Sequence, residues 1–321
     1  MFDRKPFSLC LCILVIAALN LGAQQASLSG PISGYVFEAP SRSIRPIMGI
    51  PGAAYVGDAV AAGLDWAAIA PGGSSALART GGEVYWISGL ESNLSWSMVE
   101  GALPDAGRIA WSADGTAAVI ASSTEGRIQF IRAAAAGPVV DLPGRVSALA
   151  MGPSGDYAVV GVEAEAGGGL YLVGTEGEPR LLAAVGQATA IAMAADERDL
   201  FVADAASRQV LEIANFRQEA ARMVFADEGS GISDPVGLAL SRDGRLLLLA
   251  NKSQRTLNAY VLASRSLWSQ IELDFEPSFL EPLSRNSLFL LKAGGEAGEP
   301  LLVLDASREP AVYFVPAGRG E

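Results

Sequence analysis

Residues 235–262 read PVGLALSRDGRLLLLANKSQRTLNAYVL, and this stretch decides the fold. Two apolar runs, 235–240 and 246–250, are separated by a turn that contains Asp243-Gly244. Asp-Gly between apolar runs is a strong hairpin signal, because Gly adopts positive φ at little cost and Asp bonds its own turn backbone. Residues 258–262 and 268–273 add two further strands. The sequence therefore predicts a four-stranded antiparallel unit.

Similar turn pairs recur along the chain, at Gly72-Gly73, Asp114-Gly115, Ser154-Gly155, Asp196-Glu197, Asp243-Gly244 and Arg285-Asn286. The second members are 42, 40, 42, 47 and 42 residues apart. This period is typical of one blade of a β-propeller, a small sheet that buries its faces against the neighbouring sheets. We therefore predict an all-β propeller with six complete four-stranded blades.

The first strand of each unit is rich in alanine. These strands are predicted at residues 66–70, 109–112, 146–151, 190–194, 236–240 and 278–283. Alanine and glycine are poor strand formers, so their recurrence at one place indicates that neighbouring strands crowd together at the central axis. The second strands, such as 157–162 and 200–203, are apolar throughout, as expected of sheets covered on both faces.

Closure of the ring involves the N-terminal segment. Residues 34–38 and 44–47 are typical of two outer strands of a blade that lacks inner strands, and the cluster at 49–53 predicts a loop. We expect residues 24–63 to form N-terminal strands and a linker that help to seal the ring, with the repeats spanning 64–321. A seven-bladed ring with one divergent blade is the alternative.

The repeats resemble those of secreted bacterial β-propellers of the YVTN and NHL types, a lactonase-like and WD-repeat-like group. Residues 235–251, with Thr256-Leu257 and residues 260–262, are similar to a YVTN repeat. Val202-Ala203-Asp204, followed by Arg208-Gln209-Val210, is similar to the NHL variant. The resemblance implies a propeller that is exported, and it leaves activity open because this superfamily contains both catalysts and inert scaffolds.

The N-terminus has the pattern of a secretory signal peptide. Arg4 and Lys5 precede an apolar run at residues 9–19, and small residues follow up to Ala23. We predict a signal peptide at residues 1–23 and a secreted or periplasmic location. The only cysteines, Cys10 and Cys12, lie inside this segment, and the chain contains no histidine. The mature chain therefore has no disulfide, thiolate nucleophile, histidine base or Cys/His zinc site.

Charge limits the partners. The formal net charge is −12, and removal of residues 1–23 makes it −13. Nucleic acid and anionic membranes require clustered cations, so we expect neither as a partner, nor membrane insertion after signal cleavage. An envelope protein, a peptide or a saccharide is the expected partner of a monomeric chain.

The loops around the channel mouth are the predicted binding site. In a propeller, the loops that enter first strands and those that join second to third strands share one face. The candidates on that face are Asp65, Arg108, Arg145, Asp204, Arg208, Asp234, Asn251 and Arg255. Arginine among carboxylates favours a polar ligand such as a sugar or a peptide carboxylate. The simpler interpretation is that Asp204 and Asn251 cap turn backbone and that Arg208 and Arg255 are ordinary loop cations.

Three function hypotheses remain. The first is a non-catalytic binding or scaffold module with no cofactor and no metal. The second is a lactonase or gluconolactonase-like hydrolase with Ca²⁺ at the channel mouth, for which Asp65, Asp204, Asp234 and Asn251 are the candidate ligands. The third is an assembly role for exposed outer strands. The five tryptophans are expected to pack between blades, and a sugar-stacking role is open only to one that is exposed.

Overall fold

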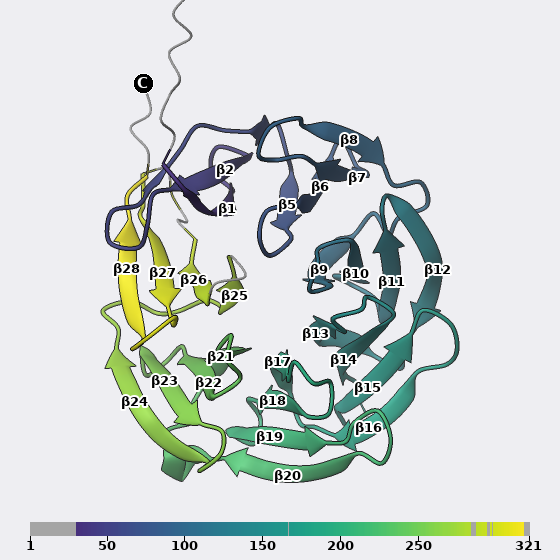
Figure 1. Cartoon of the computed structure of the whole chain (residues 1–321). Helices are drawn as coiled ribbons and strands as arrows, with labels where there is room; N and C mark the ends of the chain where they lie inside the picture. Colours follow the sequence, from purple (N-terminus) through teal and green to yellow (C-terminus); the bar gives the residue numbers. More distant parts are fainter. Residues whose placement is uncertain (1–29, 166, 284–286, 294–295, 297, 318–321) are drawn as a thin grey trace, which may run out of the picture.

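The chain folds into a closed ring of seven antiparallel sheets (Figure 1). The computed structural model describes residues 30–317 apart from 166, 284–286, 294–295 and 297. The predicted signal peptide at 1–23 and the turn pair Arg285-Asn286 lie outside the described residues. No helix in the described part has the length and apolar character needed to span a membrane.

Each sheet is one blade, numbered here in chain order. Blade 1 contains β1 (Ile32–Glu38), β2 (Ser43–Met48), β3 (Tyr55–Val56) and β4 (Ala61–Ala62). Blade 2 contains β5 (Trp66–Ile69), β6 (Ser75–Thr80), β7 (Glu83–Ser88) and β8 (Ser95–Met98). Blade 3 contains β9 (Ala106–Trp111), β10 (Ala117–Ser122), β11 (Arg127–Arg132) and β12 (Ala135–Asp141). Blade 4 contains β13 (Arg145–Met151), β14 (Tyr157–Glu163), β15 (Gly169–Gly174) and β16 (Arg180–Ala184).

The other three blades complete the ring. Blade 5 contains β17 (Ala188–Met193), β18 (Leu200–Asp204), β19 (Gln209–Ala214) and β20 (Ala221–Ala226). Blade 6 contains β21 (Pro235–Leu240), β22 (Leu246–Asn251), β23 (Thr256–Val261) and β24 (Ser266–Glu272). Blade 7 contains β25 (Glu281–Pro282), β26 (Leu288–Lys292), β27 (Leu301–Asp305) and β28 (Ala311–Val315). A short 3-10 helix, Glu228–Ser230, joins blades 5 and 6.

The expectation of six blades sealed by an N-terminal hairpin is wrong. The N-terminal strands form a blade of their own, in which β1 pairs with β2, and β3 and β4 both pair with the far side of β2. β1 is the strand of that blade nearest to the central axis and lies beside β5 (Figure 1), and no further strand lies inside it among the described residues, as the sequence indicated. The repeat was hidden because blade 1 has no first strand and therefore no first-to-second turn, and because its last strand is split into β3 and β4.

The turns after the first strands have the backbone conformation that the sequence predicts. The second residues of the pairs have φ values of 71° at Gly73, 72° at Gly115, 77° at Gly155, 57° at Glu197 and 66° at Gly244. Asp243 Oδ1 accepts hydrogen bonds from the Ser241 hydroxyl at 2.7 Å and from the Arg245 N–H at 3.1 Å. These bonds fix the turn and therefore the register of β21 and β22.

First strands crowd together at the hub, as the alanine pattern predicts. A Cβ on Gly237 in β21 would lie 2.5 Å from the Leu280 nitrogen of the next blade. A Cβ on Gly161 in β14 would lie 2.6 Å from the Ala188 Cβ in the next blade. Larger side chains at these places would force neighbouring blades apart.

Within the described residues, blade 1 lacks the innermost strand of the other six blades, and its strands run as their second, third and fourth strands do. Its β1–β2 loop, with Arg42 at φ 51°, matches the second-to-third loops of blades 5 and 6, which have Arg208 at 52° and Arg255 at 54°. Near the start of β1, Gly34 lies against Leu283, and Tyr35 lies against Gly73 in the β5–β6 turn. At the far end, Arg42 accepts a backbone hydrogen bond from Leu64, directly before β5, at 3.0 Å. β1 therefore begins at the face where β5 and β25 end. Its sheet crosses the ring three times, with β3 and β4 sharing the last crossing, so the chain reaches blade 2 from the correct face.

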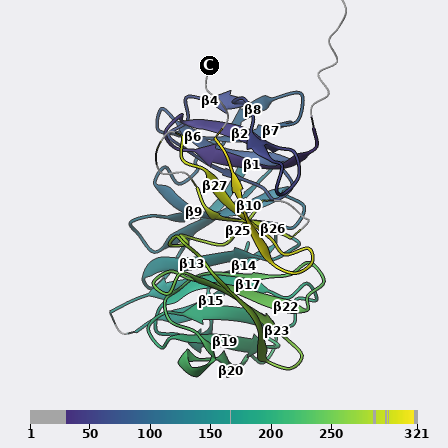
Figure 2. The same ribbon diagram turned by 90° about the vertical axis from the view of Figure 1, so that its left-hand side faces the viewer.

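Within the described residues, the first and last blades meet without sharing a strand. Blade 7 lies directly beside blade 1 (Figure 2). Apolar residues from both blades form one cluster, which includes Val36, Ile47, Leu290 and Val315. The Val56 N–H also donates to the Pro316 carbonyl at 3.2 Å. Side-chain packing therefore closes the ring.

Candidate functional site

The two faces of the ring carry different loops. We use "mouth face" for the face where the chain enters β5, β9, β13, β17, β21 and β25 and where second strands join third strands. "Turn face" means the opposite face, with the turns that join first to second strands and third to fourth strands. The eight candidates from the sequence belong to the mouth face, whereas the two cavities described below open on the turn face.

The side chains of Asp204 and Asn251 form hydrogen bonds with backbone groups of neighbouring loops. The Asp204 carboxylate accepts hydrogen bonds from the N–H groups of Gly186, Gln187 and Ala206 at 3.0, 2.8 and 3.2 Å. Burial opposes its ionisation, but the N–H groups of Gln187 and Gly186 outweigh burial, and the pKa of Asp204 lies below its usual value. Asn251 accepts from the Ser233 N–H at 3.1 Å and donates to the Gly231 carbonyl at 3.0 Å.

Four other candidates have local partners: Asp65 at the entry to blade 2, Arg208 in blade 5, and Asp234 and Arg255 in blade 6. Asp65 pairs with Arg42, Arg208 with Glu228 at 2.9 Å, and Arg255 with Glu276 at 3.6 Å. Asp234 accepts a hydrogen bond from the Ser253 hydroxyl at 2.6 Å. These residues are spread around the ring rather than directed at one point. Their role as ligand contacts stays a prediction.

Arg108 and Arg145 are the two candidates that the structure brings together. Arg145 forms an ion pair with Glu163 at 2.5 Å. Burial lowers the pKa of the Arg108 guanidinium, and the neighbouring charge of Arg145 lowers it further. Glu281 from blade 7 is close enough to act on Arg108 across the hub, and burial raises the pKa of its carboxyl although the side chain still reaches solvent. Two cations and two carboxylates thus share this part of the channel.

A lactonase-like metal centre would need several oxygen ligands around one point. Within the described residues, no three Asp or Glu side chains are grouped closely enough to hold a metal ion. The carboxylates of Asp65 and Asp204 and the amide of Asn251 already have hydrogen-bond partners in separate blades.

A groove of about 840 Å³ opens on the turn face between blades 6 and 7. Three exposed arginines line it: Arg242 and Arg245 from the β21–β22 turn, and Arg308 from the β27–β28 turn. Trp268 from β24 also lines the groove and is 50% exposed. Three cations beside an exposed indole form a distinctive surface on a chain with a net charge of −12.

The turn geometry explains why the groove is cationic. Asp243 is the carboxylate beside Arg242 and Arg245, and its pKa is lowered first by the hydrogen bond from the Ser241 hydroxyl and then by the Arg245 N–H. The Asp243 carboxylate therefore accepts hydrogen bonds within the turn. The Arg242 N–H donates to the Ser287 hydroxyl of blade 7 at 3.2 Å, which fixes the two blades at the floor of the groove.

The sequence pattern favoured the mouth face, and it did not single out the residues of this groove. Arg242 and Arg245 flank the turn that identifies the fold, and Arg308 comes from a turn 63 residues beyond Arg245 in the chain. Trp86 and Trp111 pack edge to face at 5.3 Å between blades 2 and 3, as expected of core tryptophans. Trp268 and the 38% exposed Trp96 differ from them, because they lie on outermost strands.

No protein-family model matches the chain, and no curated protein matches it in sequence. Its fold is similar to that of a chain in the crystal structure of the nidogen/laminin complex, with a TM-score of 0.53 and 15% identity over 74% of this chain and 93% of that chain. This likeness shows the fold alone, a seven-bladed β-propeller like that of nidogen. The narrower resemblance to YVTN and NHL repeats stays a prediction.

Proposed function

We propose that this protein is an exported binding module that holds an acidic saccharide in the groove between blades 6 and 7. The observation that carries the proposal is the exposed Trp268 beside Arg242, Arg245 and Arg308. An indole offers a flat apolar face on which a sugar ring can stack, and guanidinium groups bind carboxylates in a planar, bidentate way. The predicted signal peptide supports export to the periplasm or beyond.

The acidity of the chain supports an anionic ligand at this place. A chain of net charge −12 repels anions at long range, so anion binding requires cations gathered at one place. Distant repulsion is screened over about 8 Å at physiological salt, whereas contacts inside the groove persist. The groove therefore selects for a polymer that brings its carboxylates into direct contact with arginine.

Calorimetric titration of the mature chain with oligogalacturonate, maltohexaose and oligoglutamate tests the proposal. We expect saturable binding of oligogalacturonate that weakens with salt, and no binding of the neutral maltohexaose. Trp268→Ala and the double change Arg245→Gln with Arg308→Gln should each weaken binding about tenfold or more, equivalent to about 1.4 kcal/mol. Trp96→Ala and Arg222→Gln are matched controls on other blades and should have no effect.

Two results would overturn the proposal. Equal binding of oligoglutamate with no loss in Trp268→Ala would show that the groove recognises an acidic peptide and not a sugar. Absence of binding to any of the three ligands at low salt would show that the groove is not an anion site.

A further inference from the structure

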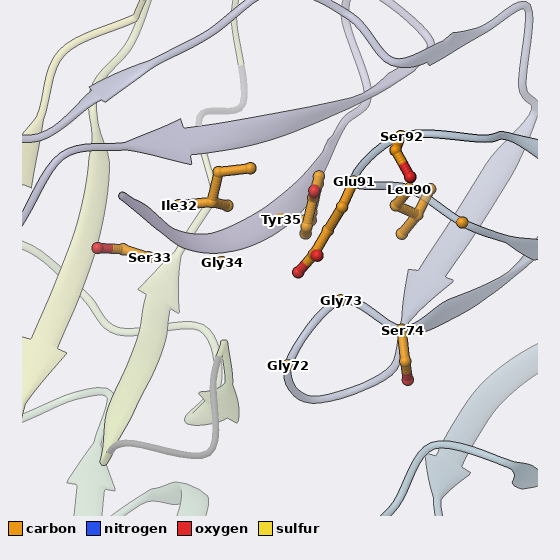
Figure 3. Close-up of a pocket in the computed structure, with 11 residues that line it drawn as sticks. Ile32, Ser33, Gly34, Tyr35, Gly72, Gly73, Ser74, Leu90, Glu91 and Ser92 are labelled. Carbon is orange, nitrogen blue, oxygen red and sulfur yellow. The ribbon is translucent and has the colours of Figure 1, made fainter. Parts of the chain in front are cut away.

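A second cavity opens on the turn face, between blades 1 and 2 (Figure 3). Its volume is about 610 Å³, and its walls come from the start of β1, the β5–β6 turn and the β7–β8 loop. No candidate from the sequence lies in it. It is separated from the arginine-lined groove by blade 7 and blade 1, so the two cavities are independent.

Tyr35 lines this cavity with a buried hydroxyl that has no partner. The residue is 4% exposed, and its hydroxyl makes no hydrogen bond within the described part of the chain. Burial raises the pKa of this hydroxyl, and the charge of Glu91 raises it further. A buried polar group without a partner is costly, and such groups in native proteins call for a reason such as a missing ligand.

Gly73, at the tip of the β5–β6 turn, has no side chain and so leaves room for the Tyr35 ring. A Cβ at Gly73 would lie 2.4 Å from two carbon atoms of that ring. Gly73 also has a φ of 71°, which disfavours any other residue. The backbone therefore holds the tyrosine firmly against the cavity wall.

Among the described residues that line this cavity, Glu91 is the only charged one. Its side chain runs along the Tyr35 ring, and its carboxylate points into the space between Gly34 and Gly73 (Figure 3). It is exposed, and it forms no hydrogen bond or ion pair with any described residue. A solvent-facing carboxylate can rotate, which would open access to the hydroxyl behind it.

We propose that this cavity binds an arginine side chain of a peptide partner. A guanidinium group has five N–H donors in one plane, so it can donate to the Glu91 carboxylate and the Tyr35 hydroxyl together. Ile32, Leu90 and the Tyr35 ring provide apolar walls for the methylene stem. The negative charge of the chain favours approach of a cationic partner.

Calorimetric titration of the mature chain with N-acetyl-arginine amide tests this site. The neutral, isosteric N-acetyl-citrulline amide is the matched ligand control. We expect weak saturable binding of the arginine compound and at least tenfold weaker binding of the citrulline compound. Glu91→Gln should weaken arginine binding by about tenfold, as expected for loss of a charge-assisted hydrogen bond. Glu100 is an exposed glutamate on the mouth face and does not line the cavity, so Glu100→Gln removes the same charge and should have no effect.

Tyr35→Phe gives an independent readout. It should weaken arginine binding without lowering the thermal midpoint, because it removes an unsatisfied hydroxyl and keeps the ring. Equal binding of the citrulline compound, unchanged binding in Glu91→Gln, or no binding at millimolar arginine compound would each overturn the proposal. Trp268→Ala should leave this binding unchanged, so failure here is distinguishable from failure of the saccharide site.

Discussion

At residue 204, one buried carboxylate holds the backbone that leads into blade 5. Asp204 is 2% exposed and accepts from three N–H groups in two separate segments. Its position in the repeat made backbone capping the simpler interpretation from sequence, and its hydrogen bonds agree with that role. Glu281, by contrast, interacts electrostatically with Arg108 from the opposite side of the hub. No local sequence pattern could predict an interaction across the ring.

Asp204→Ala should destabilise the protein by about 2 kcal/mol, because it removes a buried carboxylate that accepts from three N–H groups. Urea unfolding at pH 7 measures this change. Asp243→Ala is a control in an exposed turn and should cost about 1 kcal/mol or less. A loss at residue 204 no larger than that of the control would contradict the capping role.

The pH dependence of stability provides a second test of Asp204. Its pKa is lower in the folded chain than its usual value of 3.8. The ionised carboxylate therefore stabilises the fold fully above pH 3.8, and that contribution is lost as the pH falls through the folded pKa. The free-energy difference between wild type and Asp204→Asn should shrink between pH 5 and about pH 2. If the free-energy difference stays constant over this pH range, the ionised form of Asp204 does not stabilise the fold as proposed.

At the scale of the elements, turn chemistry made the repeats readable from the sequence. Positive φ at Gly73, Gly115, Gly155 and Gly244 gave a local signal with a regular period. Blade 1 lacks this signal because it has no first-to-second turn among the described residues; its β1–β2 loop, with Arg42 at φ 51°, is equivalent to the second-to-third loops that contain Arg208 and Arg255. The first strand of blade 7 also shrinks to Glu281–Pro282, because proline cannot donate to a sheet.

Gly73 and Gly244 occupy equivalent positions in the turns after β5 and β21, but substitution by alanine should lower the stability of the protein by different amounts. Gly244 has a φ of 66° with nothing within 4 Å of an added Cβ, so Gly244→Ala should cost only about 1–2 kcal/mol for the left-handed backbone. Gly73→Ala adds a collision with the Tyr35 ring and should cost about 1–3 kcal/mol more. Chemical denaturation of both variants measures the difference. Equal losses would show that blade 1 does not pack on the β5–β6 turn as described.

At the scale of the whole molecule, the seam between blades 1 and 7 is where the ring should open most easily. Each of the other neighbouring pairs is joined by the chain itself, whereas blades 1 and 7 meet through an apolar cluster and the Val56 to Pro316 hydrogen bond. Hydrogen exchange should therefore be faster in β1, β2 and β28 than in β14, β18 and β22. Uniform protection around the ring would contradict a seam closed by packing alone.

The sequence predicted an exported all-β ring but could not fix its closure. Repeat proteins stabilise each unit through its neighbours, so the count of units depends on the least regular one. Here that unit is blade 1, which has no innermost strand among the described residues. The cavities could not be foreseen either, because each combines turns of different blades on a face that the sequence argument did not favour.

Engineered disulfides test the direction of β1, and with it the arrangement of the first blade, most directly. In a chain with Cys10 and Cys12 changed to Ser, Gly34→Cys with Leu283→Cys should form an intramolecular bond, since a Cβ at Gly34 would lie 3.2 Å from the Leu283 Cβ, near the span of about 3.5–4.5 Å that disulfides require. Glu38→Cys with Leu283→Cys should not, because four residues along a strand separate the two positions by about 13 Å. Mass spectrometry after mild oxidation reads both results. A bond at Glu38 and none at Gly34 would mean that β1 runs parallel to the first strands of the other blades, which would contradict its place as a second strand in the seven-bladed ring.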